Sequence, residues 1–296
     1  MTHLRVGTRG SELALWQTRW VCDRLREKHA SIEIEEIIIK THGDTAADQS
    51  LGGDWPVGAF VSAIEKALLG DAIDFAVHSH KDLQTAATAG LTVAAIPARE
   101  DAHDVLLTRA PFTIANVPDG FRVATGSPRR AAQIRRLGRV EIVPIRGNVP
   151  TRIAKLTRED LDGLVLAAAG LKRLGIKHPH ETALPTDRFV PSPAQGALAV
   201  QARDDGTAAQ LLACLDHEPS RRAVAAERSF LATINAGCHT PVGALAAIDG
   251  ASVSLYAQLF SDDGSRLAEG REAGTDPAEV GKRLADRLMR RLAATQ

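Results

Sequence analysis

The sequence of 296 residues is poor in cysteine and has no long apolar run. Its three cysteines, Cys22, Cys214 and Cys238, include no C-x-x-C pair, and their odd number argues against a disulfide framework. No basic segment followed by an apolar one opens the sequence, and no apolar run reaches the roughly 20 residues that span a bilayer. We therefore expect a soluble, cytoplasmic protein that does not use a membrane.

Net charge is also absent, because 36 acidic residues balance 36 basic ones. No overall field attracts the protein to nucleic acid, so we expect no nucleic-acid partner, and any anion recognition must be local. The sequence lacks the G-x-x-x-x-G-K-[ST] loop, and no G-x-G-x-x-G follows its first strand-like segment. Both absences argue against nucleotide binding.

The pattern of apolar residues predicts an α/β protein with more than one domain. A strand over 4–8, an amphipathic helix over 11–28 and a β-branched strand over 32–39 begin the first α/β unit, and the pattern restarts near Asp104. A strand near Ala197 allows a domain order that is not strictly sequential. From Val242 onward, plain strands and a final helix over 277–292 indicate a small α+β domain.

Three basic clusters follow predicted strands, where α/β sheets bind their ligands. In the segment 125–130, Ser127 is suited to cap a helix that begins at Pro128, with Arg129 and Arg130 in its first turn. Similar clusters lie at 146–152, where Asn148 is the expected cap, and at 8–11. Guanidinium groups pair with carboxylates, so three clusters together favour a ligand with several carboxylates. For any single cluster, helix capping with solvated arginines is the simpler interpretation.

Asp82 follows a predicted strand over 75–77, so we expect it at the mouth of the same cleft as the basic clusters. A carboxylate there is suited to acid/base work and to stabilising a cation. By itself, an Asp after a strand is more often a turn residue or a partner for the adjacent Lys81. His78 and His80 have the spacing of two metal ligands, but no clear third and fourth ligand accompanies them, so we expect no metal site.

Cys238 lies in a predicted turn beside His239, between a helix and the first strand of the last domain. A thiol on such a loop is better placed to react than Cys22 or Cys214, which fall on helical patterns. A small buried residue that packs a turn explains Cys238 about as well.

A series of motifs along nearly the whole chain resembles the hydroxymethylbilane synthase (porphobilinogen deaminase) family. The segment 8–15 resembles T-R-x-S-x-L-A-L, 76–82 resembles A-V-H-S-x-K-D, and 99–101 resembles R-E-D. Further along, 126–133 is similar to G-[TS]-S-x-R-R-x-x-Q and 146–152 to R-G-N-V-x-T-R. The segments 169–175, 195–197 and 237–243 complete the order. Each motif is weak alone, but the ordered series is specific.

The resemblance implies a fold of two lobes like type II periplasmic binding proteins around a cleft, plus a small α+β C-terminal domain. The expected domains are 1–98 with a return segment 197–216, then 99–196, and finally 217–296, which carries the cofactor cysteine. The family assembles hydroxymethylbilane for haem and other tetrapyrroles. The resemblance thus implies a monomeric transferase that deaminates four porphobilinogen molecules and joins them head to tail on a primer.

The resemblance also implies a role for each site residue. A dipyrromethane cofactor is bound through a thioether to Cys238. Asp82 is the catalytic residue, which protonates the departing amine, stabilises the azafulvenium and assists the later proton loss. The remaining cofactor-binding residues are Lys81, Asp104, Ser127, Arg129, Arg130 and Arg146. The substrate-binding residues are Arg9, Ser11, Phe60, Arg99, Arg152, Arg173 and Gln195.

One loop departs from the family pattern, which usually reads close to G-G-K-G-L-F. Here residues 52–60 lack the lysine, with Val57 in its place, and Asp54 adds a negative charge. We expect the chemistry to survive, with Trp55 and Phe60 forming an aromatic cover over the cleft. Two rival interpretations remain: a two-lobed binding protein for an anionic metabolite, and a paralogue that keeps the fold without turnover.

Overall fold

The computed structural model describes residues 2–40, 61–235 and 240–294, and within them the chain forms two compact units. The first unit comprises Met1–Glu100 and Gly196–Arg221, and the second comprises Asp101–Gln195 and Arg222–Gln296. None of the helices in these described ranges is long and apolar enough to cross a membrane.

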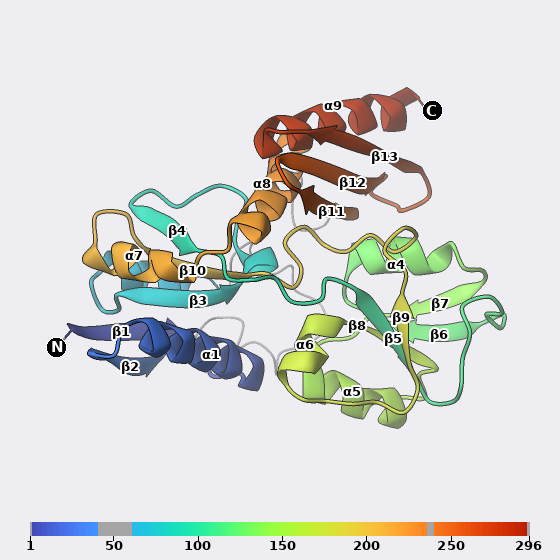
Figure 1. Cartoon of the computed structure of the whole chain (residues 1–296). Helices are drawn as coiled ribbons and strands as arrows, with labels where there is room; N and C mark the ends of the chain where they lie inside the picture. Colours follow the sequence, from blue (N-terminus) through green and yellow to red (C-terminus); the bar gives the residue numbers. More distant parts are fainter. Residues whose placement is uncertain (1, 41–60, 236–239, 295–296) are drawn as a thin grey trace. The chain divides into compact units, whose positions relative to one another are not determined.

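The first unit is built on a five-stranded sheet in the order β2-β1-β3-β10-β4 (Figure 1). β1 runs parallel to β2 and β3, whereas β10 is antiparallel to both β3 and β4. The strands are β1 (Thr2–Thr8), β2 (Ile32–Ile38), β3 (Phe75–Ser79), β4 (Leu91–Ala95) and β10 (Leu198–Arg203). The helices are α1 (Glu12–Lys28), α3 (Ser62–Leu69) and α7 (Thr207–Leu212), with 3-10 turns at His80–Asp82 and Ala213–Leu215.

Alternating residues of β3 face different helices, because side chains along a strand point to opposite faces of the sheet. Phe75 and Val77 belong to the apolar cluster that includes residues of α1, and Ala76 packs in the cluster that includes α3. The same alternation places His78 on the α3 side of the sheet and Ser79 on the α1 side. This arrangement brings polar residues from both faces to the end of β3.

The second unit contains another five-stranded sheet, in the order β7-β6-β8-β5-β9. β6 is parallel to β7 and β8, and β5 is antiparallel to β8 and β9. The strands are β5 (Asp104–Thr108), β6 (Phe121–Ala124), β7 (Val140–Val143), β8 (Gly163–Ala167) and β9 (Glu181–Leu184). The helices between them are α4 (Pro128–Arg135), α5 (Val149–Arg158) and α6 (Ala168–Arg173).

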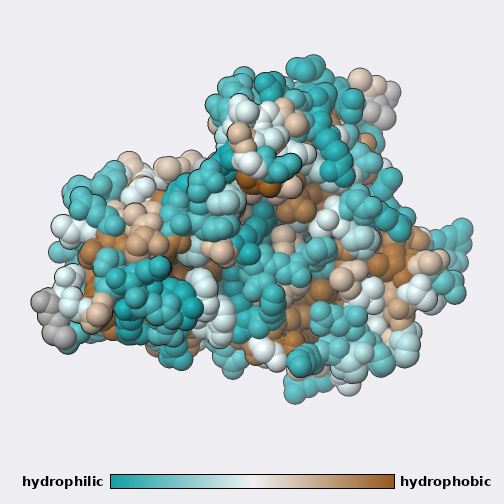
Figure 2. All heavy atoms as spheres, in the orientation of Figure 1, coloured by the Kyte–Doolittle hydropathy of each residue, from teal (hydrophilic) through white to brown (hydrophobic). Residues whose placement is uncertain are grey.

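The C-terminal part of the second unit is an antiparallel sheet of β11 (Val242–Asp249), β12 (Ser252–Phe260) and β13 (Leu267–Gly274). α8 (Glu218–Thr233) and α9 (Pro277–Ala294) share an apolar core with this sheet. The two helices meet closely at Gly281, where a Cβ atom would collide with the carbonyl oxygen of Ala226. Hydrophilic residues predominate over α9 on the face shown in Figure 2, as expected of an amphipathic surface helix.

The predicted fold class is confirmed, because two sheet-containing α/β lobes are followed by a small α+β part with a three-stranded sheet. The strand expected near Ala197 is β10, which lies between β3 and β4 of the first sheet. The division of the second unit into separate domains near residue 217 stays a prediction.

Candidate functional site

The first group of candidate residues follows β1 and β3, two parallel neighbours whose carboxyl ends meet at one edge of the first sheet. Arg9 follows β1 directly, and the Ser11 side chain caps α1 by accepting a hydrogen bond from the backbone N–H of Ala14 at 3.4 Å. After β3 the chain turns through His80–Asp82, which is anchored where the His80 N–H donates to the carbonyl of Ala197 at 3.0 Å.

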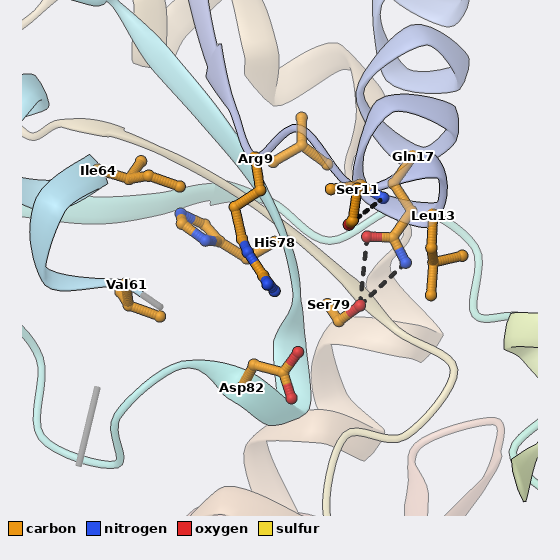
Figure 3. A pocket seen from close by; sticks show the side chains of 11 residues that line it. Arg9, Ser11, Leu13, Gln17, Val61, Ile64, His78, Ser79 and Asp82 are labelled. Atoms are coloured by element: carbon orange, nitrogen blue, oxygen red, sulfur yellow. Dashed lines mark hydrogen bonds between the residues drawn. The ribbon is translucent and has the colours of Figure 1, made fainter. Parts of the chain in front are cut away.

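These residues line a pocket of about 80 Å³ (Figure 3). Arg9, directly after β1, and Asp82, from the turn after β3, point toward one another in this view. On the opposite wall, Gln17 Nε2 donates to Ser79 Oγ at 2.9 Å, which ties α1 to the end of β3. The pocket is smaller than the roughly 300–1,000 Å³ of most small-molecule sites. The described lining therefore suits a single substituent of a larger ligand, with the Arg9 cation and the Asp82 carboxylate on facing sides.

His78 also lines the pocket, although its side chain is buried and belongs to the α3 side of the sheet. Burial is the main cause that lowers the pKa of His78 to about 4, and the positive charge of Arg9 lowers it further. The imidazole is therefore neutral at pH 7.

The second group of candidates lies at the carboxyl ends of the parallel strands β6, β7 and β8 in the second unit. Ser127 caps α4 by accepting from the Arg130 N–H at 3.4 Å, and Asn148 caps α5 by accepting from the Thr151 N–H at 2.9 Å. Both caps are confirmed as predicted. Gly147 has φ +117, and a Cβ there would lie 2.9 Å from Thr151 Cγ2, so the tight turn before α5 requires glycine. Arg152 Nε donates to the Gly147 carbonyl at 2.7 Å and holds this turn.

Asp104 begins β5 at this same edge, opposite Ala167 at the end of β8, and accepts from two buried arginines. Its carboxylate is 2.8 Å from Arg129 Nη1 and 2.6 Å from Arg130 Nη2, and only 1 % of its surface is exposed. The two guanidinium groups hold the pKa of Asp104 well below its usual range despite its burial. Two cations that share one carboxylate leave this cluster with a net positive charge.

Gln195 completes the buried cluster. Its Nε2 donates to Asp104 Oδ1 at 2.9 Å and to the carbonyl of Ala102 at 2.8 Å, and the side chain has no exposed surface. Gln133 extends the network, because its Oε1 accepts from Arg129 and its Nε2 donates to Gln258 of β12. The amides thus orient the charged groups and connect them to the C-terminal sheet.

The remaining candidates differ in their surroundings. Lys81 is exposed beside Asp82, and the backbone N–H of Arg99 donates to Ser220 Oγ at 2.9 Å. Arg146 is half-buried in the loop between β7 and α5, and Arg173 is buried at the end of α6. Cys238 and Phe60 lie outside the described residues, as does the expected aromatic cover that includes Trp55.

The structure therefore brings Arg9, Ser11 and Asp82 together in the first unit. In the second unit it brings Asp104, Arg129 and Arg130 into direct contact, while Arg146 and Arg152 follow β7 and Arg173 lies at the end of α6. The sequence interpretation missed Gln17 as a lining residue and considered His78 only as a metal ligand. Gln17 had a usable signal, because it is a polar residue that lies on the buried face of an amphipathic helix.

The fold and these sites define a two-lobed α/β protein with basic residues at the carboxyl ends of its strands. Two family models match it: "Porphobilinogen deaminase, dipyromethane cofactor binding domain" over residues 4–210 and "Porphobilinogen deaminase, C-terminal domain" over residues 222–290. The chain belongs to the porphobilinogen deaminase family.

Curated relatives match along nearly the entire chain. Porphobilinogen deaminase of Roseiflexus castenholzii is 41% identical over 290 residues, covering 97% of this chain and 95% of the relative. The enzyme of Moorella thermoacetica is 40% identical over 295 residues, covering 98% and 94%, and that of Nocardia farcinica is 43% identical over 304 residues, covering 97% and 86%.

Solved structures with a similar arrangement include the methionine-binding protein MetQ, with a TM-score of 0.45 and 12% identity over 72% of this chain and 89% of the other. A TRAP periplasmic solute-binding protein from Desulfovibrio salexigens has a TM-score of 0.43 and 10% identity over 74% and 73%.

Proposed function

We propose that this protein is a hydroxymethylbilane synthase that deaminates four porphobilinogen molecules and joins them head to tail. The observation that carries the proposal is the pocket in which Asp82 faces Arg9, within a chain that belongs to the porphobilinogen deaminase family. This reaction requires two groups: a cation that holds the anionic ligand, and a carboxylate that faces the developing positive charge.

Asp82 is the residue we assign to proton transfer. Its carboxyl group gives a proton to the amino group of porphobilinogen, so that ammonia leaves, and the resulting carboxylate faces the positive charge left on the pyrrole methylene. Once the new carbon–carbon bond has formed, the carboxylate takes up the proton that the coupled ring loses. The proton is returned, so Asp82 is ready for the next unit.

Arg9 and Ser11 are the groups we assign to holding the substrate in the first lobe. A guanidinium beside a helix N-terminus, as at α1, pairs well with a carboxylate. With the acid side chain fixed there, the ring of the substrate is held next to Asp82. Positioning of this kind lowers the entropy lost in the transition state.

The second unit fits the dipyrromethane cofactor, whose pyrrole rings carry acetate and propionate groups. The fit rests on the donor set at the sheet edge, where Arg129 and Arg130 share the Asp104 carboxylate and retain a net positive charge. When bound to Cys238, this cofactor supplies the primer to which the pyrrole units are added. We assign its binding to the remaining predicted residues, namely Lys81, Ser127, Arg129, Arg130, Arg146 and Asp104.

Further contacts to the substrate are proposed for Arg99, Arg152, Arg173 and Gln195, and for Phe60. Gln195 already donates its amide hydrogens to Asp104 and Ala102, which supports a role in orienting Asp104 toward the arginines. We also propose that the enzyme acts as a cytoplasmic monomer, and an elution volume at twice the expected mass would contradict the monomer.

The test is the intact mass of the purified protein and of its Cys238→Ser variant, with Cys214→Ser as the matched control. We expect wild type and the control to carry a mass excess of two condensed pyrrole units, and Cys238→Ser to lack it. Wild-type protein should then consume porphobilinogen and release a linear tetrapyrrole. An unmodified wild-type chain that stays unmodified with porphobilinogen would favour a binding protein or an inactive paralogue.

A further inference from the structure

A series of polar side chains, buried except for the half-buried Thr88, leads to the pocket on the α3 side of the first sheet. Thr88 Oγ1 donates to Glu65 Oε2 at 2.9 Å, and Gln201 Nε2 donates to Glu65 Oε1 at 2.9 Å. β10 pairs with β3 so that Ala199 is opposite His78 and Gln201 is opposite Ala76. Gln201 and His78 are therefore diagonal neighbours on the same face of the sheet.

The Glu65 carboxylate sets the direction of the Gln201 amide. Because a carboxylate accepts hydrogen bonds, the amide nitrogen of Gln201 faces it and Oε1 faces away. Gln201 Oε1 and His78 Nε2 are both buried and make no hydrogen bond in the described part of the chain. The Gln201 side chain nevertheless raises the pKa of His78 against the effect of burial, as an oxygen that accepts an imidazole N–H does. Nε2 is the buried ring nitrogen, and Gln201 Oε1 is a buried acceptor on the same face of the sheet, so an N–H at Nε2 would be directed toward Gln201.

Because His78 is neutral, its other ring nitrogen can act only as a hydrogen-bond acceptor. Only 6 % of His78 is exposed, and Arg9 stands close enough to disfavour the imidazolium. A neutral imidazole has a single N–H, so with that group directed at Gln201 the second nitrogen carries a lone pair. Figure 3 shows the His78 ring beside the Arg9 side chain in the pocket. A lone pair attracts the guanidinium, whereas a charged imidazole would repel it.

We propose that His78 is a positioning residue for Arg9, a neutral imidazole that Gln201, Glu65 and Thr88 hold in one tautomer and whose lone pair fixes the direction of the guanidinium. The inference rests on the proposed function for the identity of the group that Arg9 binds, a carboxylate of the pyrrole substrate. The role is indirect: His78 sets how well Arg9 holds that carboxylate, while Asp82 carries the proton transfer.

The first test reads the tautomer directly, by long-range ¹H–¹⁵N NMR of the labelled full chain. Loss of a signal in His78→Asn assigns the resonance. Among the described residues, the charged groups around His78 are Arg9 and Asp82 in the pocket and Glu65 beyond Gln201. We expect a neutral ring in one tautomer from pH 8 to about pH 5, and a mixture of tautomers in Glu65→Gln, whose amide can present either atom to Gln201. A midpoint near the ordinary histidine value, or an unchanged spectrum in Glu65→Gln, would overturn the proposal.

The second test separates KM from kcat for porphobilinogen. His78→Leu removes the lone pair. We expect KM to rise about tenfold, because the substrate loses binding free energy equal to roughly one hydrogen bond, while kcat stays within about threefold of wild type. His78→Asn keeps one donor and one acceptor and should return KM to within about threefold of wild type. His29→Asn is the matched control, because this partly buried histidine of the same unit contacts Leu211 outside the pocket.

Equal KM values for His78→Leu and His78→Asn, or a change confined to kcat, would overturn the positioning role. If wild-type protein does not consume porphobilinogen, the proposed function fails, while the NMR result still decides the tautomer and the charge of His78.

Discussion

Replacing Asp104 with asparagine removes the negative charge that Arg129 and Arg130 share, and keeps the shape of the side chain. All three groups are buried, with oxygen-to-nitrogen distances of 2.8 and 2.6 Å. Without the carboxylate, two guanidinium groups remain side by side in a region of low dielectric. Breaking a buried ion pair on one side typically costs about 3–5 kcal/mol, and we expect a loss of stability in this range.

The assay is urea unfolding followed by far-UV circular dichroism. Tryptophan fluorescence is unsuitable, because the three tryptophans, Trp16, Trp20 and Trp55, all precede the second unit. The matched control is Asp286→Asn on α9, where Asp286 meets Lys282 at 4.0 Å on the surface. A surface pair of this kind contributes up to about 1 kcal/mol, so this variant should unfold close to wild type.

A loss of less than about 1 kcal/mol in Asp104→Asn would refute the reasoning, since the cluster would then tolerate an uncompensated pair of cations. The pH dependence gives a second check. The folded state depresses the pKa of Asp104, so the stability it contributes is present above the unfolded pKa of about 3.9 and is lost as pH falls further. The difference between wild type and Asp104→Asn should therefore shrink below about pH 4.

Four further outcomes are expected. Asp82→Asn should lower turnover of porphobilinogen by about 10²- to 10⁴-fold, while the protein keeps its melting temperature; turnover within a few fold of wild type would contradict the proton-transfer role. Arg9→Lys should raise KM by about tenfold or more, because lysine cannot pair bidentately with a carboxylate, and an unchanged KM would exclude Arg9 as its partner. As pH falls from about 6.5 toward 4, the free energy of unfolding of wild type should fall by up to about 3 kcal/mol relative to that of His78→Asn, because His78 binds a proton at higher pH in the unfolded chain than in the folded one; parallel curves of stability against pH would refute this. Glu227→Gln should destabilise the protein by about 1–3 kcal/mol in urea, because the buried Glu227 accepts from the backbone N–H groups of Ala194 and Ala246, and Glu279→Gln on α9 serves as the control.

Local signals were sufficient for most of the secondary structure. The capping side chains of Ser127 and Asn148 mark the starts of α4 and α5, because they offer oxygen acceptors to N–H groups that the first helical turn leaves unpaired. The strand over 32–38 and the long helix α9 follow from their periodicity in the same way. The elements that were not expected, α6 and β9, are short. α6 begins after Ala167 without a side-chain cap, so no local pattern announces it.

The candidate site was predictable to a different degree in the two units. Arg9, Ser11 and Asp82 follow strands that are neighbours and parallel, so their clustering could be expected from the sequence. The surroundings of Arg129 and Arg130 could not. The sequence shows two arginines at the start of a helix, which suits a solvent-exposed ligand site. Asp104 lies in β5, two elements before that helix, and its pairing with the arginines depends on how β5 joins the sheet.

By itself, the sequence determined the alternation of strands and helices, the helix caps, and the membership of a family whose motifs it carries in order. These depend on short-range periodicity, on the chemistry of a few adjacent residues, and on motif order. Tertiary structure decided the insertion of β10 between β3 and β4, the burial of His78 and the sharing of Asp104 by two arginines. Each of these depends on which distant segments pack together and exclude water, and it is the loss of water that changes the charge state and hydrogen bonding of a side chain.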